Sequence, residues 1–556
     1  MSRFFRVKPL ARSLADAERS EQPLKRALGP VQLTALGIGG IVGAGIFSTA
    51  GAAAAGGQGH LGAGPALAVS FALVAVACGF AALCYAEFAA MTPVAGSAYT
   101  YAYGTLGELA AWLIGWDLIL EYAVGNVAVA ISWSGYFQEL LRSVGLHWPV
   151  WLGTDYRSAS QGVAQLAQAC ATLPWPAYWQ QLCGGLGLEP AGWLGADQAA
   201  SGPLSQALAA AQSGHSALAS LSATVLSGAS AYGQAPRLLA VPVLFNLPAL
   251  LIIAFITWLL VRGVRESAGF NTTVVALKLL IILFFLAVGA CYVQPSNWVP
   301  FAPNGFAGVS SAAAIIFFAY IGFDAVSTAA EESRNPQRDM PVSMVASLLI
   351  CTVIYVAVAI VLTGLTKWNQ LDTAEPLAFA FSHLGLHWAA GITSVGALLA
   401  TTSVLMTFQL GQPRIFFVMA RDGLLPPWAA RVHARYRTPH VTTILTGVLV
   451  GGFAAATNIN EMVELCNIGT LFAFILVAVG IVVLRQTDPQ RARPFRTPWV
   501  PWVPLGAIVS CGYLMMKLPP VTWRRFVYWM AAGLVIYLGY GIRRSRLNAG
   551  GLTSDG

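Results

Sequence analysis

Long apolar segments separated by short polar turns run along almost the whole chain. A helix needs about 20 consecutive apolar residues to cross the hydrocarbon core of a membrane. Twelve segments approach this length, and they cover residues 31–56, 64–91, 107–145, 239–262, 268–293, 308–330, 343–365, 388–418, 440–457, 461–484, 500–517 and 525–542. The pattern predicts an all-α polytopic membrane protein with twelve transmembrane helices.

The first apolar segment contains an unusual run of glycines between Leu36 and Gly51, in the sequence LGIGGIVGAGIFSTAG. Each glycine inside a helix costs about 1 kcal/mol relative to alanine. Irregular backbone is tolerated at membrane depth only where its polar groups line a buried cavity. We therefore expect the N–H groups from Gly43 to Ile46 to face an anion and the carbonyls that end the inner half to face a cation. An amino acid zwitterion carries both charges. The alternative is that the glycines only let two helices pack closely.

The sixth apolar segment contains a second interruption, in the sequence FFAYIGFDAVSTAAEESRNPQRDMP. Gly322 breaks a run of small residues and Asp324 follows it. Two interrupted spans with four intact ones between them predict a 5+5 inverted repeat, in which helices 1 and 6 are unwound and face a common site. Helices 11 and 12 are then two extra C-terminal helices.

The composition and the placement of charge agree with this topology. The chain is 57% hydrophobic and only 10% charged, which excludes a soluble domain. With both termini in the cytoplasm, 23 of the 31 Lys and Arg residues fall on the cytoplasmic side, 7 fall outside and Lys278 falls within a span. This is the positive-inside rule, so the net charge of +8 reflects topology and not a nucleic-acid partner. No cleavable signal peptide is visible, and we expect a multi-pass protein of the plasma membrane.

Composition also suggests where the chain divides. The boundaries we expect are a cytoplasmic N-terminal segment at 1–30, spans 1–3 at 31–148, an extracytoplasmic insert at 149–237, spans 4–5 at 238–293, the second repeat at 294–484, and spans 11–12 with a cytoplasmic tail at 485–556. The basic N-terminal segment is expected to contact anionic membrane lipids. In the insert, an Ala-rich helix is expected at 205–226 and irregular structure elsewhere. Its role as a cap, an oligomer contact or a lineage-specific elaboration stays open.

Two cysteines lie in the insert and six lie in spans. Cys170 and Cys183 are disulfide candidates if the insert faces an oxidising compartment. No CxxC or Cys/His spacing supports a metal site, and no cofactor is expected.

Three ionisable residues inside spans are candidates for function, because charges in hydrocarbon are expensive. Glu121 lies deep in the third span, and Asp117 lies one turn before it. For Asp117 the alternative is a solvated position near the inner interface. Lys278 lies about two turns into the fifth span, where the alternative is that its long side chain reaches out to water.

Five motifs together resemble one known family. They are GIGGIVGAGIF in helix 1, the helix 6 sequence quoted above, GQPRIFFVMARDGLLP after helix 8, NIGTLFAF in helix 10 and RPFRTPWVPWVP before helix 11. They resemble the amino acid-polyamine-organocation (APC) superfamily, and more narrowly its bacterial cationic amino acid transporter (CAT)-like branch. The likeness covers nearly the whole chain outside residues 149–237.

The resemblance implies particular roles for residues around the two breaks. Backbone amides near Gly43, Ala44, Gly45 and Ile46 would bind the substrate carboxylate, and carbonyls at Ile41, Phe318, Ala319 and Ile321 would meet its amino group. Phe323 would shape or gate the pocket, and Glu121 would lie near the substrate side chain. Lys278, Asp324 and Glu121 would carry protons.

These observations favour a secondary active transporter that imports cationic or small neutral L-amino acids by proton symport with alternating access. An amino acid or polyamine exchanger on the same fold is the near alternative. A membrane-embedded amino acid sensor is a more distant one. An enzyme is not expected, because no nucleophile or metal constellation lies in the spans. The sequence leaves open the choice of amino acid, the oligomeric state and any small accessory membrane subunit.

Overall fold

The structure is a computed structural model, and it describes residues 6–7, 28–57, 60–92, 97–172, 223–238, 241–263, 268–324, 326–327, 330, 333–433, 436 and 438–549. Within these residues, eight helical stretches are long and apolar enough to cross a membrane: Pro30–Ala55, Gly64–Met91, Glu108–Ser143, Thr272–Ala290, Pro336–Leu365, His387–Arg421, Ile459–Thr487 and Pro520–Arg544. Shorter apolar helices at Leu247–Val261, Gly305–Tyr320, His440–Ala456 and Trp502–Met516 occupy the places of the other four predicted spans. The fold is a helical bundle of the multi-pass kind. The count of twelve crossings and the inverted repeat stay predictions.

The α-helices are α2 (Pro30–Ile41), α3 (Ala50–Ala55), α4 (Leu67–Met91), α5 (Ser97–Thr105), α6 (Glu108–Ser143), α7 (Tyr156–Thr172), α10 (Ala223–Gln234), α11 (Leu247–Val261), α12 (Ala268–Ala290), α13 (Gly305–Ile316), α14 (Pro336–Leu365), α15 (Pro376–His383), α16 (His387–Arg421), α17 (His440–Ala456), α18 (Ile459–Thr487), α19 (Trp502–Met516), α20 (Pro520–Ile536), α21 (Ile542–Arg544) and α22 (Arg546–Ala549). Two π-helical turns are η2 (Gly45–Thr49) and η12 (Tyr537–Gly541). The 3₁₀ turns include η8 (Phe317–Tyr320) and η10 (Trp368–Gln370). Two antiparallel strand pairs join β1 (Gly56–Gly57) to β2 (His60–Leu61) and β3 (Arg237–Leu238) to β4 (Val241–Pro242).

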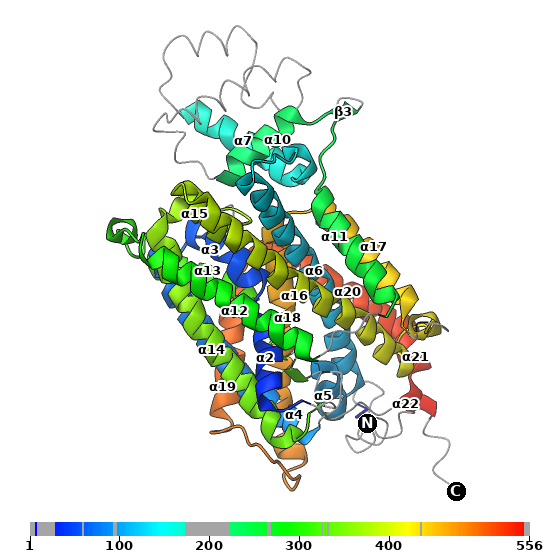
Figure 1. The fold of residues 1–556 in the computed structure, drawn as a ribbon. Helices are drawn as coiled ribbons and strands as arrows, with labels where there is room; N and C mark the ends of the chain where they lie inside the picture. Colours follow the sequence, from blue (N-terminus) through cyan, green and yellow to red (C-terminus); the bar gives the residue numbers. More distant parts are fainter. Residues whose placement is uncertain are drawn as a thin grey trace, which may run out of the picture.

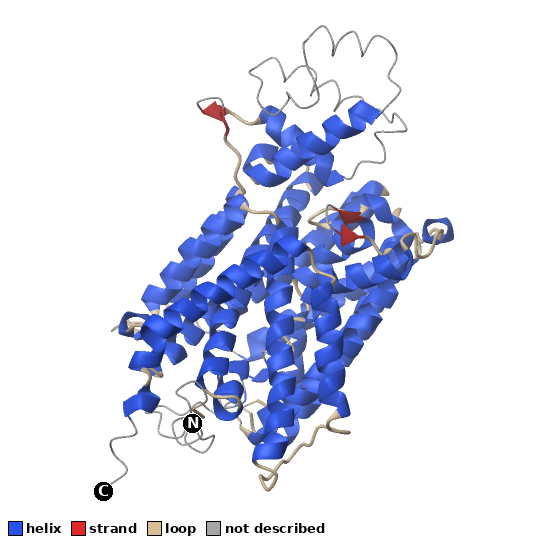
Figure 2. Ribbon diagram, turned by 180° about the vertical axis from the view of Figure 1, so that it is seen from behind, coloured by secondary structure: helices blue, strands red, loops and turns tan. Residues whose placement is uncertain are grey.

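The long helix α6 lies at the centre of the bundle and packs along α16 and α18. On the other side of the bundle, α4 packs along α14, and α2 packs between α14 and α12. Figure 1 shows α7 and α10 together at one end of the molecule, with α22 at the other. Figure 2 shows the same arrangement from behind, with both small strand pairs toward the α7 end. We call the α7 and α10 side the insert end and the α22 side the terminal end.

Short polar motifs set where the helices begin. Pro30 occupies the first turn of α2, where its missing N–H costs nothing, and the Gly29 N–H donates to Gln32 Oε1 at 3.0 Å. The Asn246 side chain accepts from the Ala249 N–H at 3.2 Å and so caps α11. These caps use residue types that the sequence shows plainly.

Several expected boundaries are corrected by the structure. The sixth span, expected over 308–330, is helical up to Tyr320, is interrupted at Gly322 as expected, and continues only as 3₁₀ turns among the described residues from Asp324 to Ala330. The insert is more regular than expected, because Tyr156–Thr172 forms α7 and packs on α10. Of the Ala-rich helix expected at 205–226, the structure describes only the part from residue 223, where α10 begins. Cys183 and the side chain of Cys170 lie outside the described residues, so the disulfide stays a prediction.

A buried ion cluster ties helices together at the terminal end. The Glu87 carboxylate on α4 is fully buried, and Arg485 of α18 donates to both of its oxygens, at 3.0 and 2.8 Å. Arg493 lies 3.3 Å from the same carboxylate, and the Thr497 N–H donates to it at 2.7 Å. Helix α18 is therefore joined to α4 by a bidentate, charge-assisted contact, and Arg493 and Thr497 bind the loop before α19 to the same carboxylate.

Candidate functional site

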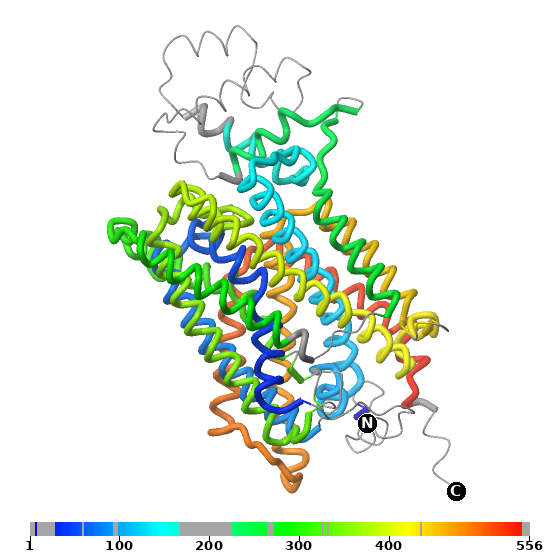
Figure 3. The backbone as a smooth tube through the Cα atoms, in the orientation of Figure 1, coloured from blue at the N-terminus to red at the C-terminus, as the bar shows by residue number. Residues whose placement is uncertain are grey.

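The first crossing is interrupted at the glycines that the sequence singles out. Helix α2 ends at Ile41, and Val42 takes an extended conformation (φ −77°, ψ 98°). The chain resumes as the π-turn η2 at Gly45, and the first backbone hydrogen bond of this second half runs from the Phe47 N–H to the Gly43 carbonyl, at 3.3 Å. Because the helix is interrupted, the N–H groups just before Phe47 have no preceding helical turn whose carbonyls could accept their hydrogen bonds. They form the positive end of the half-helix. Figure 3 shows this crossing as the dark blue trace through the bundle.

The sixth crossing is interrupted at Gly322. Its 3₁₀ turn η8 ends at Tyr320, and Ile321 is extended (φ −62°, ψ 132°). Gly322 has a φ of +120°, a conformation that residues with a side chain rarely adopt. Its N–H donates to Asp324 Oδ1 at 3.2 Å, so the aspartate holds the turn that follows the break. The next long helix is α14, which starts at Pro336.

The two breaks lie directly against each other. A Cβ atom built on Gly45 would lie 2.2 Å from the Cα of Ala319, and one built on Gly322 would lie 2.6 Å from the carbonyl carbon of Gly40. These separations leave no room for a side chain at either glycine. The two interpretations of these glycines are therefore compatible. The glycines interrupt the helices, and they also allow the two backbones to touch.

Lys278 binds the end of the first half-helix. Its side chain is only 1% exposed, and its Nζ donates to the carbonyls of Gly39 at 3.0 Å and Val42 at 3.3 Å. The alternative that this lysine reaches out to water is wrong. A cation at the C-terminal end of a helix is favourably placed, since the last carbonyls carry the negative end of the dipole.

Two further side chains hold the broken ends, and sequence reasoning missed both. The Tyr355 hydroxyl of α14 donates to the Ile41 carbonyl at 2.9 Å. The Asn467 amide of α18 donates to the carbonyls of Ala314 at 2.8 Å and Ile315 at 2.9 Å. A signal was present in each case, because a tyrosine or asparagine within an apolar span needs a buried hydrogen-bond partner.

Three carboxyl groups lie buried near the breaks. Glu121 on α6 is 4% exposed, and both Asp117 and Asp324 are close enough to act on it electrostatically. Asp117 is fully buried, which excludes a solvated position. Its carboxyl group lies against Gly469 of α18, where a Cβ would come within 2.6 Å of Oδ1, and neither of its oxygens has a hydrogen-bond partner among the described residues.

Aromatic side chains enclose Phe323, which the resemblance assigns to the pocket. Its ring is fully buried and lies 5.9 Å from that of Tyr85 on α4 and 5.2 Å from that of Phe474 on α18. At the first break, a Cβ on Gly43 would lie 2.6 Å from Val404 Cγ2 of α16. The breaks are thus lined by aromatic and branched apolar groups, with polar contacts supplied by the backbone.

The structure brings the expected substrate residues together in the centre of the bundle. All are buried: Ile41, Gly43, Ala44, Gly45, Ile46, Glu121, Phe318, Ala319, Ile321 and Phe323. Two of the expected carbonyls already accept a hydrogen bond, that of Ile41 from Tyr355 and that of Phe318 from the Ile321 N–H at 3.3 Å. A carbonyl has two lone pairs, so each retains capacity for a second donor.

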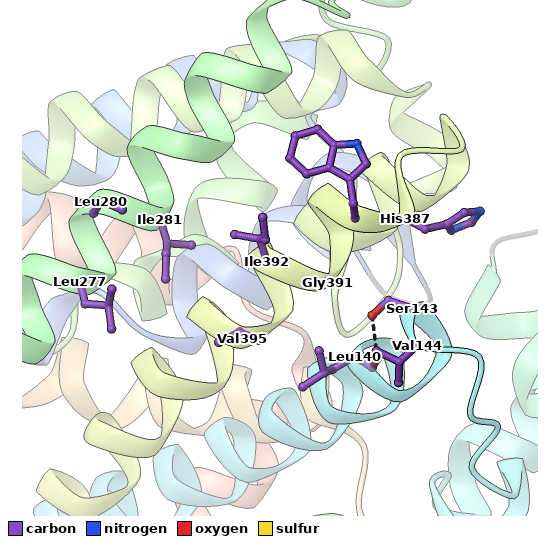
Figure 4. A pocket seen from close by; sticks show the side chains of 11 residues that line it. Leu140, Ser143, Val144, Leu277, Leu280, Ile281, His387, Gly391, Ile392 and Val395 are labelled. Atoms are coloured by element: carbon purple, nitrogen blue, oxygen red, sulfur yellow. Dashed lines mark hydrogen bonds between the residues drawn. The ribbon is translucent and has the colours of Figure 1, made fainter.

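A separate groove lies away from these residues. Figure 4 shows it between the ends of α6 and α16 and the middle of α12, where Leu277, Leu280 and Ile281 line it. The three residues lie next to Lys278 in sequence, but the lysine points inward to α2. The groove is almost wholly apolar and lacks the buried charges of the broken helices. It does not have the chemistry of a zwitterion site.

Broken, dipole-bearing half-helices beside buried ionisable groups define a membrane transport protein. The chain belongs to the amino acid permease family, since the family model for amino acid permeases matches residues 28–538. This family falls within the APC superfamily, so the resemblance read from the motifs is confirmed.

Individual relatives span nearly the full chain. The protein is 40% identical to the methylthioribose transporter of Bacillus subtilis over 99% of this chain and all of the relative. It is 40% identical to the branched-chain amino acid permease BcaP of Bacillus subtilis over 98% of this chain and 99% of the relative. It is also 29% identical to human cationic amino acid transporter 4 over 98% of this chain and 90% of that protein. These relatives are transporters, and none is named as an enzyme.

Proposed function

We propose that the protein imports amino acids across the bacterial plasma membrane by proton symport with alternating access. In this proposal both termini and the terminal end lie in the cytoplasm, and the insert end faces outward. The distribution of Lys and Arg supports this orientation. Family membership supports amino acid transport, and the buried ionisable groups near the breaks support proton coupling.

The substrate would lie between the two broken helices. Its carboxylate would accept hydrogen bonds from the N–H groups of Gly43, Ala44, Gly45 and Ile46, at the positive end of the half-helix. Its ammonium group would donate to carbonyls of the sixth crossing, at Phe318, Ala319 and Ile321. Backbone groups recognise the part that all amino acids share, so the same site suits cationic and small neutral substrates.

The observation that carries proton coupling is the position of Lys278. Its ammonium group is sealed from water and joins α12 to the last carbonyls of α2. A neutral amine would have one donor fewer and no charge, and would hold these carbonyls more weakly. Loss of its proton would therefore release the first half-helix, which couples a proton to a conformational change. Glu121 and Asp324 would carry the proton between Lys278 and the substrate.

The test is uptake of amino acids into proteoliposomes with an imposed pH gradient. We expect Lys278→Ala to abolish accumulation driven by the gradient, while the variant still inserts and still exchanges substrate across the membrane. The matched control is Lys517→Ala, which removes an exposed lysine at the end of α19 and should leave uptake unchanged. Unimpaired gradient-driven uptake by Lys278→Ala would overturn the proposal.

The same preparation distinguishes the alternatives. Counterflow by the wild-type protein that ignores the pH gradient would indicate an exchanger. Binding without any flux would indicate a sensor. A thermal-shift screen of the twenty amino acids at two pH values would identify the substrate, which the differing names of the relatives leave open.

A further inference from the structure

A short segment at the insert end covers the second half of the broken first helix. This capping segment comprises residues 366–386, between α14 and α16, and includes η10 and α15. Its Leu371 carbonyl oxygen would lie 2.1 Å from a Cβ on Gly51, and its Ala374 carbonyl accepts a hydrogen bond from the Ser48 hydroxyl. Figure 1 shows α15 beside α3 at this end of the bundle. The segment therefore closes the site from this side.

Helix α6 binds the capping segment at two points, and each involves a carboxyl group. Near the start of α15, Glu375 Oε2 would lie 2.8 Å from a Cβ on Gly135, so the carboxyl group occupies the space that this glycine leaves. One turn further along α6, Glu139 accepts a hydrogen bond from the hydroxyl of Ser382, near the end of α15. The two carboxyl groups thus lie along the same face of α6.

Within the described part of the chain, Arg142 is the one cation that acts on both Glu139 and Glu375. Arg142 of α6 forms an ion pair with Glu139, whose side chain is only 2% exposed, whereas the Arg142 side chain is 58% exposed. Glu375 is half-buried. One partly solvated guanidinium does not fully compensate two carboxylates whose burial limits their hydration. The geometry therefore lacks one positive charge when both acids are ionised.

Other titratable groups around the contact do not supply that charge. Tyr136 of α6 faces Glu375, but its hydroxyl donates to the Phe47 carbonyl. The part of the first crossing that packs on the capping segment, Gly45 to Ala55, contains no titratable residue. His383 and His387 lie at exposed positions at the far end of α15 and the start of α16.

The segment's own charged residues, Lys367 and Asp372, precede Glu375. Lys367 is exposed and Asp372 is half-buried. The electrostatic influences on the Glu375 carboxyl group come from Glu139 and Arg142.

We propose that Glu375 is a proton-binding site beside Glu139, and that the capping segment stays closed over the broken first helix while Glu375 is protonated and opens when Glu375 is ionised. The ligand of this site is the proton, and the site is separate from Lys278. Protonation at the insert end would then favour closure over the bound substrate.

The electrostatics give the direction and the pH range of this switch. Burial raises the pKa of Glu375 to about 7, the neighbouring Glu139 raises it as well, and Arg142 opposes both effects. When the segment opens, the carboxyl group meets water and its pKa returns toward the ordinary value of about 4.3. The closed form therefore binds the extra proton. Closure is favoured at low pH, and its equilibrium constant falls by about tenfold per pH unit between roughly pH 5 and 7.

Hydrogen exchange of the peptide that covers residues 371–382 tests the proposal without requiring transport. The full-length protein in lipid nanodiscs would be measured between pH 5.5 and 8, with each variant compared with wild type at the same pH. We expect the protection of this peptide in the wild type to fall as the pH rises from 5.5 to about 7 and to level off above that. Glu375→Gln keeps a neutral group of the same shape and should stay protected at every pH. Glu139→Gln should shift the transition to lower pH, because Glu139 raises the pKa of Glu375.

Two further variants separate this inference from the proposed function and from general effects of charge. Glu461→Gln removes a carboxylate at the same end, one that pairs with Arg157 and Arg525, and should leave the transition in place. Lys278→Ala should also retain it, whatever happens to uptake. A Glu375→Gln protein that loses protection with pH as the wild type does would overturn the proposal.

Discussion

The ends of the two broken helices are held by different kinds of side chain. At the end of α2, a lysine donates to the carbonyls of Gly39 and Val42. At the end of α13, the neutral amide of Asn467 donates to the carbonyls of Ala314 and Ile315. In both cases the donor comes from a helix outside the broken pair and approaches carbonyls at the C-terminal end of a half-helix.

The difference lies in whether the donor can change its charge. An ammonium group can lose a proton, and its hydrogen bonds are about twice as strong as neutral ones. An amide has no ionisable proton in the physiological range, so its hold on α13 is the same at any pH. Of the two side chains that hold half-helix ends, only Lys278 can therefore weaken its hold by losing a proton. Asn467 holds the end of α13 in the same way at any pH.

The largest expected effect comes from forcing the two breaks apart. In Gly45→Ala, the new Cβ would lie 2.2 Å from Ala319 Cα and 2.8 Å from its backbone nitrogen, and neither backbone atom can turn aside as a flexible side chain could. Overpacking of this kind costs about 1–3 kcal/mol. We expect amino acid uptake into proteoliposomes to fall by roughly ten- to a hundredfold. Substrate-induced thermal stabilisation should be lost as well.

Gly79→Ala is the matched control for that substitution. Gly79 lies within α4, and a Cβ built there has no heavy atom within 4 Å. Alanine also favours a helix more than glycine does, so this variant should transport as the wild type does. Normal uptake by Gly45→Ala would show that the two backbones need not touch during transport.

The next test removes the fixed hold on α13. Asn467→Ala deletes two buried hydrogen bonds, each with a net contribution of about 0.5–1.5 kcal/mol. We expect the free energy of unfolding in detergent micelles to drop by about 1–3 kcal/mol, by the same amount at pH 5.5 and pH 7.5. Asn460→Ala, at the partly buried first turn of the same helix, should have little effect. A loss that changes strongly between the two pH values would remove the distinction drawn between the two ends.

Much of this arrangement could be predicted from the sequence, because its signals are local. The glycines at 40, 43 and 45 and at 322 mark both breaks, since few residues other than glycine permit such close approach or a φ of +120°. Lys278 stands out because it lies about two turns inside the fifth span, among apolar residues. Apolar length alone located the long helices to within about seven residues of their observed bounds.

The contacts between distant segments could not be predicted in the same way. Tyr355 lies 314 residues from the carbonyl that it binds, and Asn467 lies 153 residues from one of its own partners. The sequence near each residue gives no indication of these distant partners. The 3₁₀ turn at Phe317–Tyr320, just before the break predicted at Gly322, was not predicted, because its residues are as apolar as the helix before them. Helix α7 was not predicted because its segment is polar, and a polar segment in the insert was expected to be irregular.

The smallest expected effect concerns the second donor at the end of α2. Tyr355→Phe removes the hydroxyl that donates to Ile41 at 2.9 Å but keeps the ring, which packs 5.4 Å from those of Phe71 and Tyr320. Since Lys278 still binds the carbonyls on either side, the half-helix should stay in place. We expect a loss of about 1 kcal/mol in the free energy of unfolding, the net contribution of one buried hydrogen bond. Tyr528→Phe, at an exposed position on α20, should cause no measurable change. If Tyr355→Phe instead abolished proton-driven uptake as completely as Lys278→Ala is expected to, the hold on α2 would not depend on a titratable group, and the contrast between the two breaks would disappear.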